Sequence, residues 1–145
     1  MSDFDFGVEG YRAKLQTKGF VGKPIYIKNW PINTLLTNIS HATRLWGADE
    51  LVAVAKLDLQ AAMRCATKSG AGEEGADLIL HMIKSVTLDG KSLDVADLNH
   101  LFEARPITAI EIFMHVIHSQ YDDFFASGLA GDLYPQASTN PPSKP

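Results

Sequence analysis

Hydrophobic residues recur at helical spacing from Pro31 almost to the end of the chain. Apolar positions that repeat every three or four residues form one face of a helix, and that face needs a neighbour to cover it. The apolar stripe of the third predicted helix, which follows Gly70, extends to Val86. We therefore predict a helical domain over residues 33–128. The breaks between its helices fall at Gly47, near Gly70, at Asp89-Gly90 and at Pro106.

Local signals mark several helix ends. Asn33, Asp49 and Asp94 are predicted N-caps, because a short polar side chain can accept from the free N–H groups of a first turn. Pro106 suits the first position of the last helix, since proline lacks the N–H that would be unpaired there. This last helix is expected to end before Gly128, a residue type that commonly stops helices.

The segments outside the helical domain have other patterns. Residues 1–32 are rich in Gly, and within them "KPIYIKNWPI" alternates so that Ile25 and Ile27 would face the same way. This predicts one short strand in an extended arm, and a lone strand needs a partner in this chain or another. Residues 129–145 are rich in Pro, Ser and Asn, which predicts a disordered tail.

The predicted fold class is therefore all-α. We expect a compact bundle of about five helices, flanked by an N-terminal extended arm and a flexible C-terminal tail.

Composition narrows the class of protein. The 145 residues suit one domain, and 46% hydrophobic content is enough to bury a core. The formal net charge is -4 and the basic residues are dispersed, which argues against nucleic acid as a partner. The apolar runs are too short to span a membrane, and the acidic start lacks a secretion signal. A single cysteine fits a reducing compartment.

The stretch "EIFMHVIHSQYDDFF" places several ionisable residues on one side of the last predicted helix. Glu111, His115, His118 and Asp122 fall within an arc of about 60°. One hypothesis is a small metal-dependent enzyme that uses Glu111, His115 and His118, because such side chains can converge on one ion. The alternative is a solvated helix face with Glu111 and His115 as an i,i+4 pair. We prefer the alternative, because no second helix carries matching ligands, and we expect no cofactor.

Other candidate residues are isolated. His41, His81 and His100 lie on separate predicted helices and are expected at or near the surface. Cys65 could be a nucleophile only if a base such as His81 lay beside it. Its small helix-forming neighbours instead favour a buried thiol. The sequence therefore predicts no catalytic residue.

The order of features resembles the tail assembly chaperones of long-tailed bacteriophages. The similarity covers about residues 25–126 and follows an apolar helix, a "V..DG..L" turn, a short "F" segment and a last helix with an aromatic end. The matching residues are Val86, Asp89, Gly90, Leu93, Phe102, Phe124 and Phe125.

This resemblance implies a non-enzymatic, helical protein of the host cell cytoplasm that is absent from the mature virion. Its implied partners are the tape measure protein, the tail-tube protein or both, with no membrane or nucleic acid involved and a homo-oligomer possible. An apolar groove could shield a long helical partner. A structural or assembly component of a contractile-tail baseplate is the alternative within the same phage context.

Aromatic residues are the best candidates for partner binding, because aromatics dominate such contacts. For Trp46, Phe113 and Phe124 core packing is the stronger expectation, while Tyr121 and Phe125 are expected to be more exposed. The predicted partner-binding residues are Tyr121, Phe124, Phe125, Trp30 and Trp46.

Overall fold

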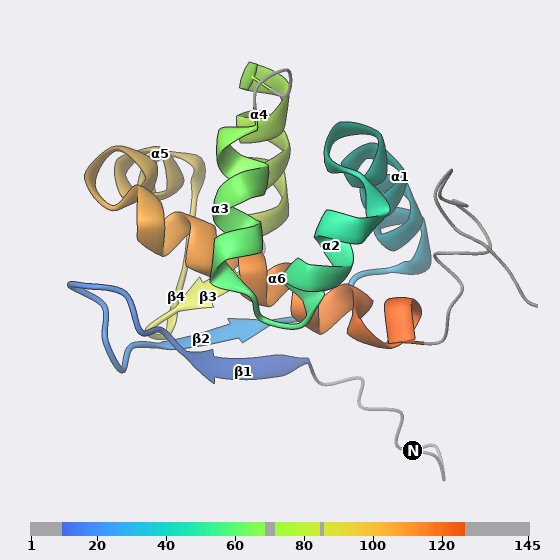
Figure 1. Ribbon diagram of the computed structural model, residues 1–145. Helices are drawn as coiled ribbons and strands as arrows, with labels where there is room; N and C mark the ends of the chain where they lie inside the picture. The colour runs from blue at the N-terminus through green and yellow to red at the C-terminus, as the bar shows by residue number, and fades with distance from the viewer. Residues whose placement is uncertain (1–9, 69–71, 85, 127–145) are drawn as a thin grey trace, which may run out of the picture.

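The structure, a computed structural model, describes residues 10–68, 72–84 and 86–126, and it combines helices with a sheet. Figure 1 shows the last helix, α6, running across the middle of the molecule between the sheet and the other helices. The helices are α1 Ile32–Trp46, α2 Ala48–Ala55, α3 Leu59–Thr67, α4 Gly72–Ile83, α5 Val95–Ala104 and α6 Pro106–Ala126. The strands are β1 Tyr11–Lys14, β2 Pro24–Ile27, β3 Val86–Leu88 and β4 Lys91–Ser92.

The all-α prediction is wrong, because the described residues form a four-stranded antiparallel sheet in the order β1-β2-β3-β4. The fold is mixed α/β with a helical majority. The predicted strand exists as β2, with Ile25 and Ile27 both buried. Its backbone groups are met on both sides, by β1 and by β3.

The second hairpin comes from a segment that the hydrophobic pattern assigned to a helix end and a turn. Val86 lies in β3 rather than in the third helix, which ends at Ile83. Asp89 and Gly90 have φ angles of 52° and 84°. Positive φ at both central residues is typical of the type I′ turn, whose twist matches that of two antiparallel strands. Asp89-Gly90 therefore closes the β3–β4 hairpin.

Some predicted helix ends are confirmed and others are wrong. Asp94 caps α5 in a capping box with Asp97, and Pro106 is the first residue of α6. Asn33 is not the N-cap of α1. This helix begins at Ile32, and its N-cap is Pro31. Asp49 lies in the first turn of α2, whose N-cap is Gly47. The predicted stops at Gly70 and Gly128, like the tail over 129–145, lie outside the described residues.

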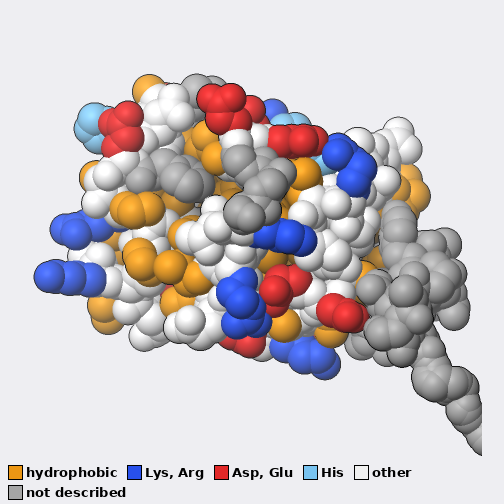
Figure 2. Space-filling view, turned by 45° about the horizontal axis from the view of Figure 1, so that its top comes forward, with side chains coloured by type: hydrophobic (Ala, Val, Ile, Leu, Met, Phe, Trp, Pro, Cys, Tyr) orange, Lys and Arg blue, Asp and Glu red, His pale blue; other side chains and the backbone are white. Residues whose placement is uncertain are grey.

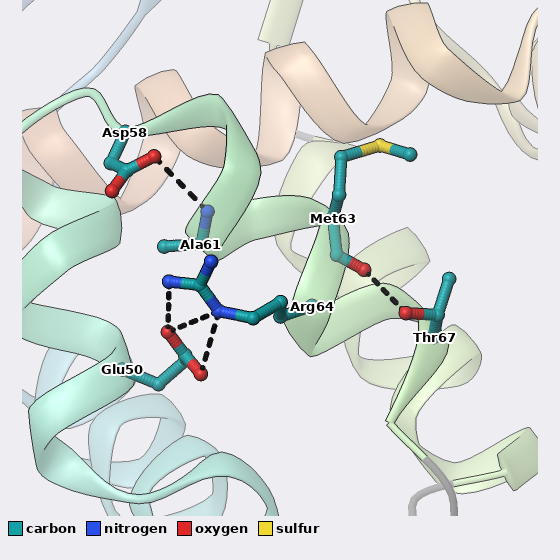
Figure 3. A network of polar contacts seen from close by, with 6 residues as sticks. All are labelled: Glu50, Asp58, Ala61, Met63, Arg64 and Thr67. Carbon is teal, nitrogen blue, oxygen red and sulfur yellow. Dashed lines mark hydrogen bonds and ion pairs between the residues drawn. The ribbon is translucent and has the colours of Figure 1, made fainter.

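The predicted second helix is divided into α2 and α3. The chain reverses at Leu57, which has a φ of 66°, and Asp58 then caps α3 by accepting from the Ala61 N–H at 3.2 Å. Arg64 reaches back to Glu50 of α2 with three hydrogen bonds of 2.9 to 3.2 Å (Figure 3). This fork-shaped contact links α3 to α2 across the turn at Leu57.

One hydrophobic core joins the sheet to the helices. Leu15 lies in the loop after β1 and is completely buried, as are Ile112, Phe113 and Ile117 of α6. Residues from Gly10 to Pro31 therefore contribute to the same core as the helical domain. Since α6 is covered by the sheet on one side and by helices on the other, both of its faces are buried along most of its length.

Candidate functional site

The polar side of α6 is covered at Glu111 and His115, so the expectation of a solvated helix face is wrong there. The predicted i,i+4 pair of Glu111 and His115 is present, with 3.9 Å between His115 Nε2 and a Glu111 oxygen. Only 3% of Glu111 and 7% of His115 is exposed. The β1–β2 hairpin lies over these residues and supplies hydrogen-bonding partners to both of them. A polar stripe on a helix can be buried when a second polar surface satisfies it, and periodicity alone cannot distinguish this from exposure to water.

Glu111 anchors the loop that follows β1. Its two carboxylate oxygens accept from the backbone N–H groups of Gln16 at 2.9 Å and of Thr17 at 3.1 Å. The Thr17 hydroxyl also lies 2.8 Å from the hydroxyl of Thr108, one turn earlier on α6. Hydrogen bonds to an ionised acceptor are stronger than neutral ones. They compensate for the cost of burying the Glu111 carboxylate.

His115 connects Glu111 to β1. Its Nδ1 lies 3.0 Å from the Tyr11 hydroxyl, and its Nε2 lies 3.9 Å from a Glu111 oxygen. Burial lowers the pKa of His115, Glu111 raises it in opposition, and His118 lowers it further. A neutral ring with its proton on Nε2 accepts the Tyr11 hydroxyl at Nδ1, which a protonated ring cannot do.

The proposed metal ligands have other partners. His118 donates from Nδ1 to the Ala55 carbonyl at 2.7 Å, while Glu111 and His115 bind the N-terminal hairpin. Within residues 10–68, 72–84 and 86–126, no group of three or more His, Cys, Asp or Glu side chains could hold a metal ion. Glu111, His115 and His118 therefore join α6 to other segments of the chain.

The remaining isolated candidates lie where the sequence predicts them. Cys65 is buried, and burial raises the pKa of its thiol to about 12, so the reactive thiolate is disfavoured. His41 is half-buried, while His81 and His100 are exposed. The His41 ring and Arg44 both contact Glu74, at 2.7 and 2.8 Å.

The buried His115 predicts lower stability at acidic pH. Its folded-state pKa lies below the unfolded value, so the unfolded chain binds more protons as the pH falls through that range. The contribution is complete above the unfolded pKa of about 6.5 and is lost on acidification below it. Urea unfolding from about pH 8 to about pH 5 measures this loss.

His115→Gln should flatten this pH dependence, because glutamine does not titrate. The matched control is His100→Gln, which removes an exposed histidine on α5 and should leave the dependence as it is. An equal slope in the wild type and in His115→Gln would contradict the assignment to His115.

The aromatic end of α6 consists of Tyr121, Phe124 and Phe125, together with Trp30 from the segment before α1. Tyr121 is its centre, with ring centroids 5.9 to 6.4 Å from those of the other three. Its hydroxyl donates to the Leu35 carbonyl at 2.6 Å, and the side chain is completely buried. The predicted exposure of Tyr121 is therefore wrong. Trp30, Phe124 and Phe125 are half-buried around it.

Trp46 lies away from the aromatic end and inside the core. Only 3% of it is exposed, and its ring packs edge-on against Phe113 at 5.3 Å. Core packing is confirmed for Trp46 and Phe113. Close to the aromatic end, α1 instead exposes Ile32 and Leu36, at 64% and 46%. These residues are one turn apart and lie on the same face of the helix.

A groove of about 440 Å³ lies at the other end of α6, between α5 and the turns of the two hairpins. We call it the α5 groove. Figure 2 shows hydrophobic side chains gathered on the α5 side of the molecule, with Lys and Arg side chains beside them. The groove is lined by apolar Phe20, Leu88, Leu93, Leu101 and Ala104, and by polar Lys23, Asp89, Lys91, Asp97, His100 and Arg105. A smaller hollow that includes Lys18 and Ile107 shares Ala104 and Arg105 with it.

Periodicity did not predict this groove, because its walls come from three separate parts of the chain. One signal was available. An Asp-Gly pair between the short runs "VTL" and "KSL" is a strong hairpin signal, and it would have placed Leu88 and Leu93 on adjacent strands. The docking of α5 and of the first hairpin against that hairpin is a tertiary property.

Comparison with known families adds an independent observation. A family model described as "Phage tail assembly chaperone protein, TAC" matches residues 36–131, about two thirds of the chain. The chain belongs to this family. No curated protein and no solved structure matches it. The match begins inside α1, so the β1–β2 hairpin of this phage tail assembly chaperone precedes the matched region.

The matched region of the chaperone includes the β3–β4 hairpin, α5 and the aromatic end of α6. No helix among the described residues is long and apolar enough to cross a membrane. Family membership favours a non-enzymatic role in the assembly of a phage tail.

Proposed function

We propose that the protein is a non-enzymatic chaperone that binds the tape measure protein, the tail-tube protein or both while a phage tail is assembled. It acts in the host cell cytoplasm and is absent from the finished virion. The observation that carries this proposal is the family match over residues 36–131. The metal-enzyme alternative lacks a supporting cluster in the described residues, and the matching family is described as a chaperone rather than as a baseplate component.

The partner-binding surface that we propose is the half-buried part of the aromatic end together with the exposed face of α1. Trp30, Phe124 and Phe125 supply aromatic area, while Ile32 and Leu36 supply aliphatic area at a solvent-facing position. Exposed apolar side chains that gather on one surface are typical of protein-binding sites. An elongated partner helix could bury its own apolar stripe against them. Tyr121 and Trp46 support this surface from the core.

Co-expression with each tail protein encoded by the same phage tests the function. We expect the tape measure or tail-tube protein to remain soluble and to co-purify with the chaperone. We also expect mass spectrometry of purified virions to lack the chaperone. Stoichiometric chaperone in those particles would contradict the proposal and would favour a structural role.

A pair of variants tests the surface separately. Replacing both Ile32 and Leu36 with serine should weaken binding to the tail protein by about tenfold or more, because interface apolar contacts are removed. The control is Leu57→Ser, which removes a 41% exposed leucine from the loop between α2 and α3. Equal binding by the double variant and the control would place the contact elsewhere on the chaperone.

A further inference from the structure

A pocket of about 320 Å³ lies between the start of α1 and the end of α4. We call it the α1–α4 pocket. Its described lining consists of Trp30, Pro31, Thr34 and Asn38 on one side and of His81 and Lys84 on the other. This described lining includes the cation of Lys84 and no acidic side chain. The pocket adjoins the aromatic end of α6, because the Trp30 ring packs edge-on against Tyr121 at 5.9 Å.

Asn38 is the unusual member of this lining. Only 4% of it is exposed, and its Nδ2 group is buried without a hydrogen-bond partner among the described residues. A buried amide group without an acceptor costs free energy, so nearly all such groups in folded proteins are paired. The Asn38 amide therefore supplies two N–H donors at the wall of the pocket for which the described part of the fold has no acceptor.

The first turn of α1 adds further donors on the same side of the pocket. A helix start has free backbone N–H groups and the positive end of the helix dipole. The N-cap of α1 is Pro31, which forms no side-chain cap, and the first turn contains no acidic residue. Thr34 and Asn38 are one turn apart and both line the pocket. The start of α1 and the Asn38 amide are thus arranged to donate to one acceptor.

Lys84 supplies the positive charge on the opposite side. It is exposed just after the end of α4, and within the described residues it forms no ion pair. Partial burial lowers the pKa of His81, and the neighbouring Lys84 and His41 lower it further. The His81 ring is therefore mainly neutral near pH 7, and one uncompensated cation remains beside the pocket. Several N–H donors with one cation and no acid suit a single carboxylate.

We propose that the α1–α4 pocket binds an acidic side chain of the tail protein that the chaperone holds. The carboxylate accepts from the Asn38 amide and from the first turn of α1, while Lys84 neutralises its charge. The Trp30 ring covers the aliphatic part of the same side chain. A polypeptide is the favoured source of the carboxylate, because Trp30 belongs both to this pocket and to the proposed partner-binding surface. The inference rests on the proposed function and adds to it the requirement for an acidic residue in the bound segment.

Titration of the full, isotope-labelled chain with a small probe tests the site without the tail protein. The probe is the capped tripeptide leucyl-glutamyl-leucine, and its control is the same tripeptide with glutamine in place of glutamate. We expect saturable chemical-shift changes at the Asn38 side-chain amide and at the backbone N–H groups of Asn33 and Thr34. The glutamine tripeptide should bind at least about tenfold more weakly, and added salt should weaken only the glutamate tripeptide. Equal binding of the two tripeptides, or no binding of either, overturns the proposal.

Two variants separate a binding role from a structural one. Lys84→Glu should weaken binding of the glutamate tripeptide at least about tenfold, whereas Lys56→Glu, which reverses an exposed lysine after α2, should bind like the wild type. Asn38→Leu should lose binding to the same extent while its melting temperature stays equal or rises, because an apolar side chain of similar size replaces an unpartnered amide. A large fall in the melting temperature of Asn38→Leu would show that the amide supports the fold, and would contradict its role in binding.

The tail protein itself gives the second measurement. Lys84→Glu and Asn38→Leu should each bind it at least about fivefold more weakly than the wild type and Lys56→Glu do. If all four proteins bound the tail protein equally, the pocket would not hold an acidic side chain of this partner, although the proposed function would stand. Failure of the wild type to bind any tail protein would instead contradict the proposed function, and the tripeptide titration would still measure the carboxylate site.

Discussion

Replacing Tyr121 with alanine is expected to lower the free energy of unfolding by about 4 kcal/mol, because it removes a completely buried aromatic ring. The ring lies among Trp30, Phe124 and Phe125, so its loss leaves a cavity between the start of α1 and the end of α6. Urea denaturation followed by circular dichroism measures the change.

Tyr121→Phe is the matched control, because it retains the ring and removes only the hydroxyl that donates to the Leu35 carbonyl. That single hydrogen bond is expected to contribute about 1 kcal/mol. If Tyr121→Ala were as stable as the wild type, Tyr121 would be an exposed side chain rather than a core residue. The buried arrangement of the aromatic end would then be wrong.

Replacing Glu111 with alanine is expected to lower the free energy of unfolding by about 3 kcal/mol, because two backbone N–H groups lose their charged acceptor. The loss should be concentrated in the first hairpin. Hydrogen exchange of Gln16 and Thr17 should therefore accelerate more than that of core amides in α2.

Two variants define this effect. Glu111→Gln retains one acceptor oxygen and should lose less stability than Glu111→Ala. Glu103→Ala removes an exposed carboxylate from α5 and should change stability by less than about 0.5 kcal/mol. Unchanged hairpin exchange in Glu111→Ala would show that the Glu111 carboxylate does not anchor the loop.

Glu111 and His115 show how the N-terminal segment contributes to the protein. The family match begins after it, yet Leu15, Ile25 and Ile27 belong to the common core. The hairpin buries the polar stripe of α6 through Glu111 and His115 and forms one wall of the α5 groove through Phe20 and Lys23. The hairpin is therefore part of the folded domain.

Features with a local physical cause were predictable from the sequence. Asp94 caps α5 and Pro106 begins α6, because the conformation and hydrogen bonding of one turn decide both. Buried Cys65 and the alternation of Ile25 and Ile27 were also predictable. The aromatic end was recognised from the family resemblance, which the family match supports independently.

The sheet was missed because its evidence is divided along the chain. Val86–Leu88 contains only three residues, too few to distinguish a strand from the end of a helical stripe, and its partner strand lies about sixty residues earlier. The positive φ angles at Asp89 and Gly90 could have been inferred from the Asp-Gly pair. Such a turn predicts a hairpin at this place instead of the end of a helix.

The sequence by itself determined the capped start of α5, the start of α6 at Pro106, the amphipathic strand β2 and membership of the tail assembly chaperone family. Only the tertiary structure decided which surfaces face solvent. The spacing of Glu111 and His115 is the same whether water or a hairpin covers them, and the spacing of Tyr121 is the same in a core or at an interface. Burial depends on which distant segments pack together. Here the N-terminal hairpin packs on α6 and forms hydrogen bonds with Glu111 and His115, which the sequence alone had predicted to face solvent.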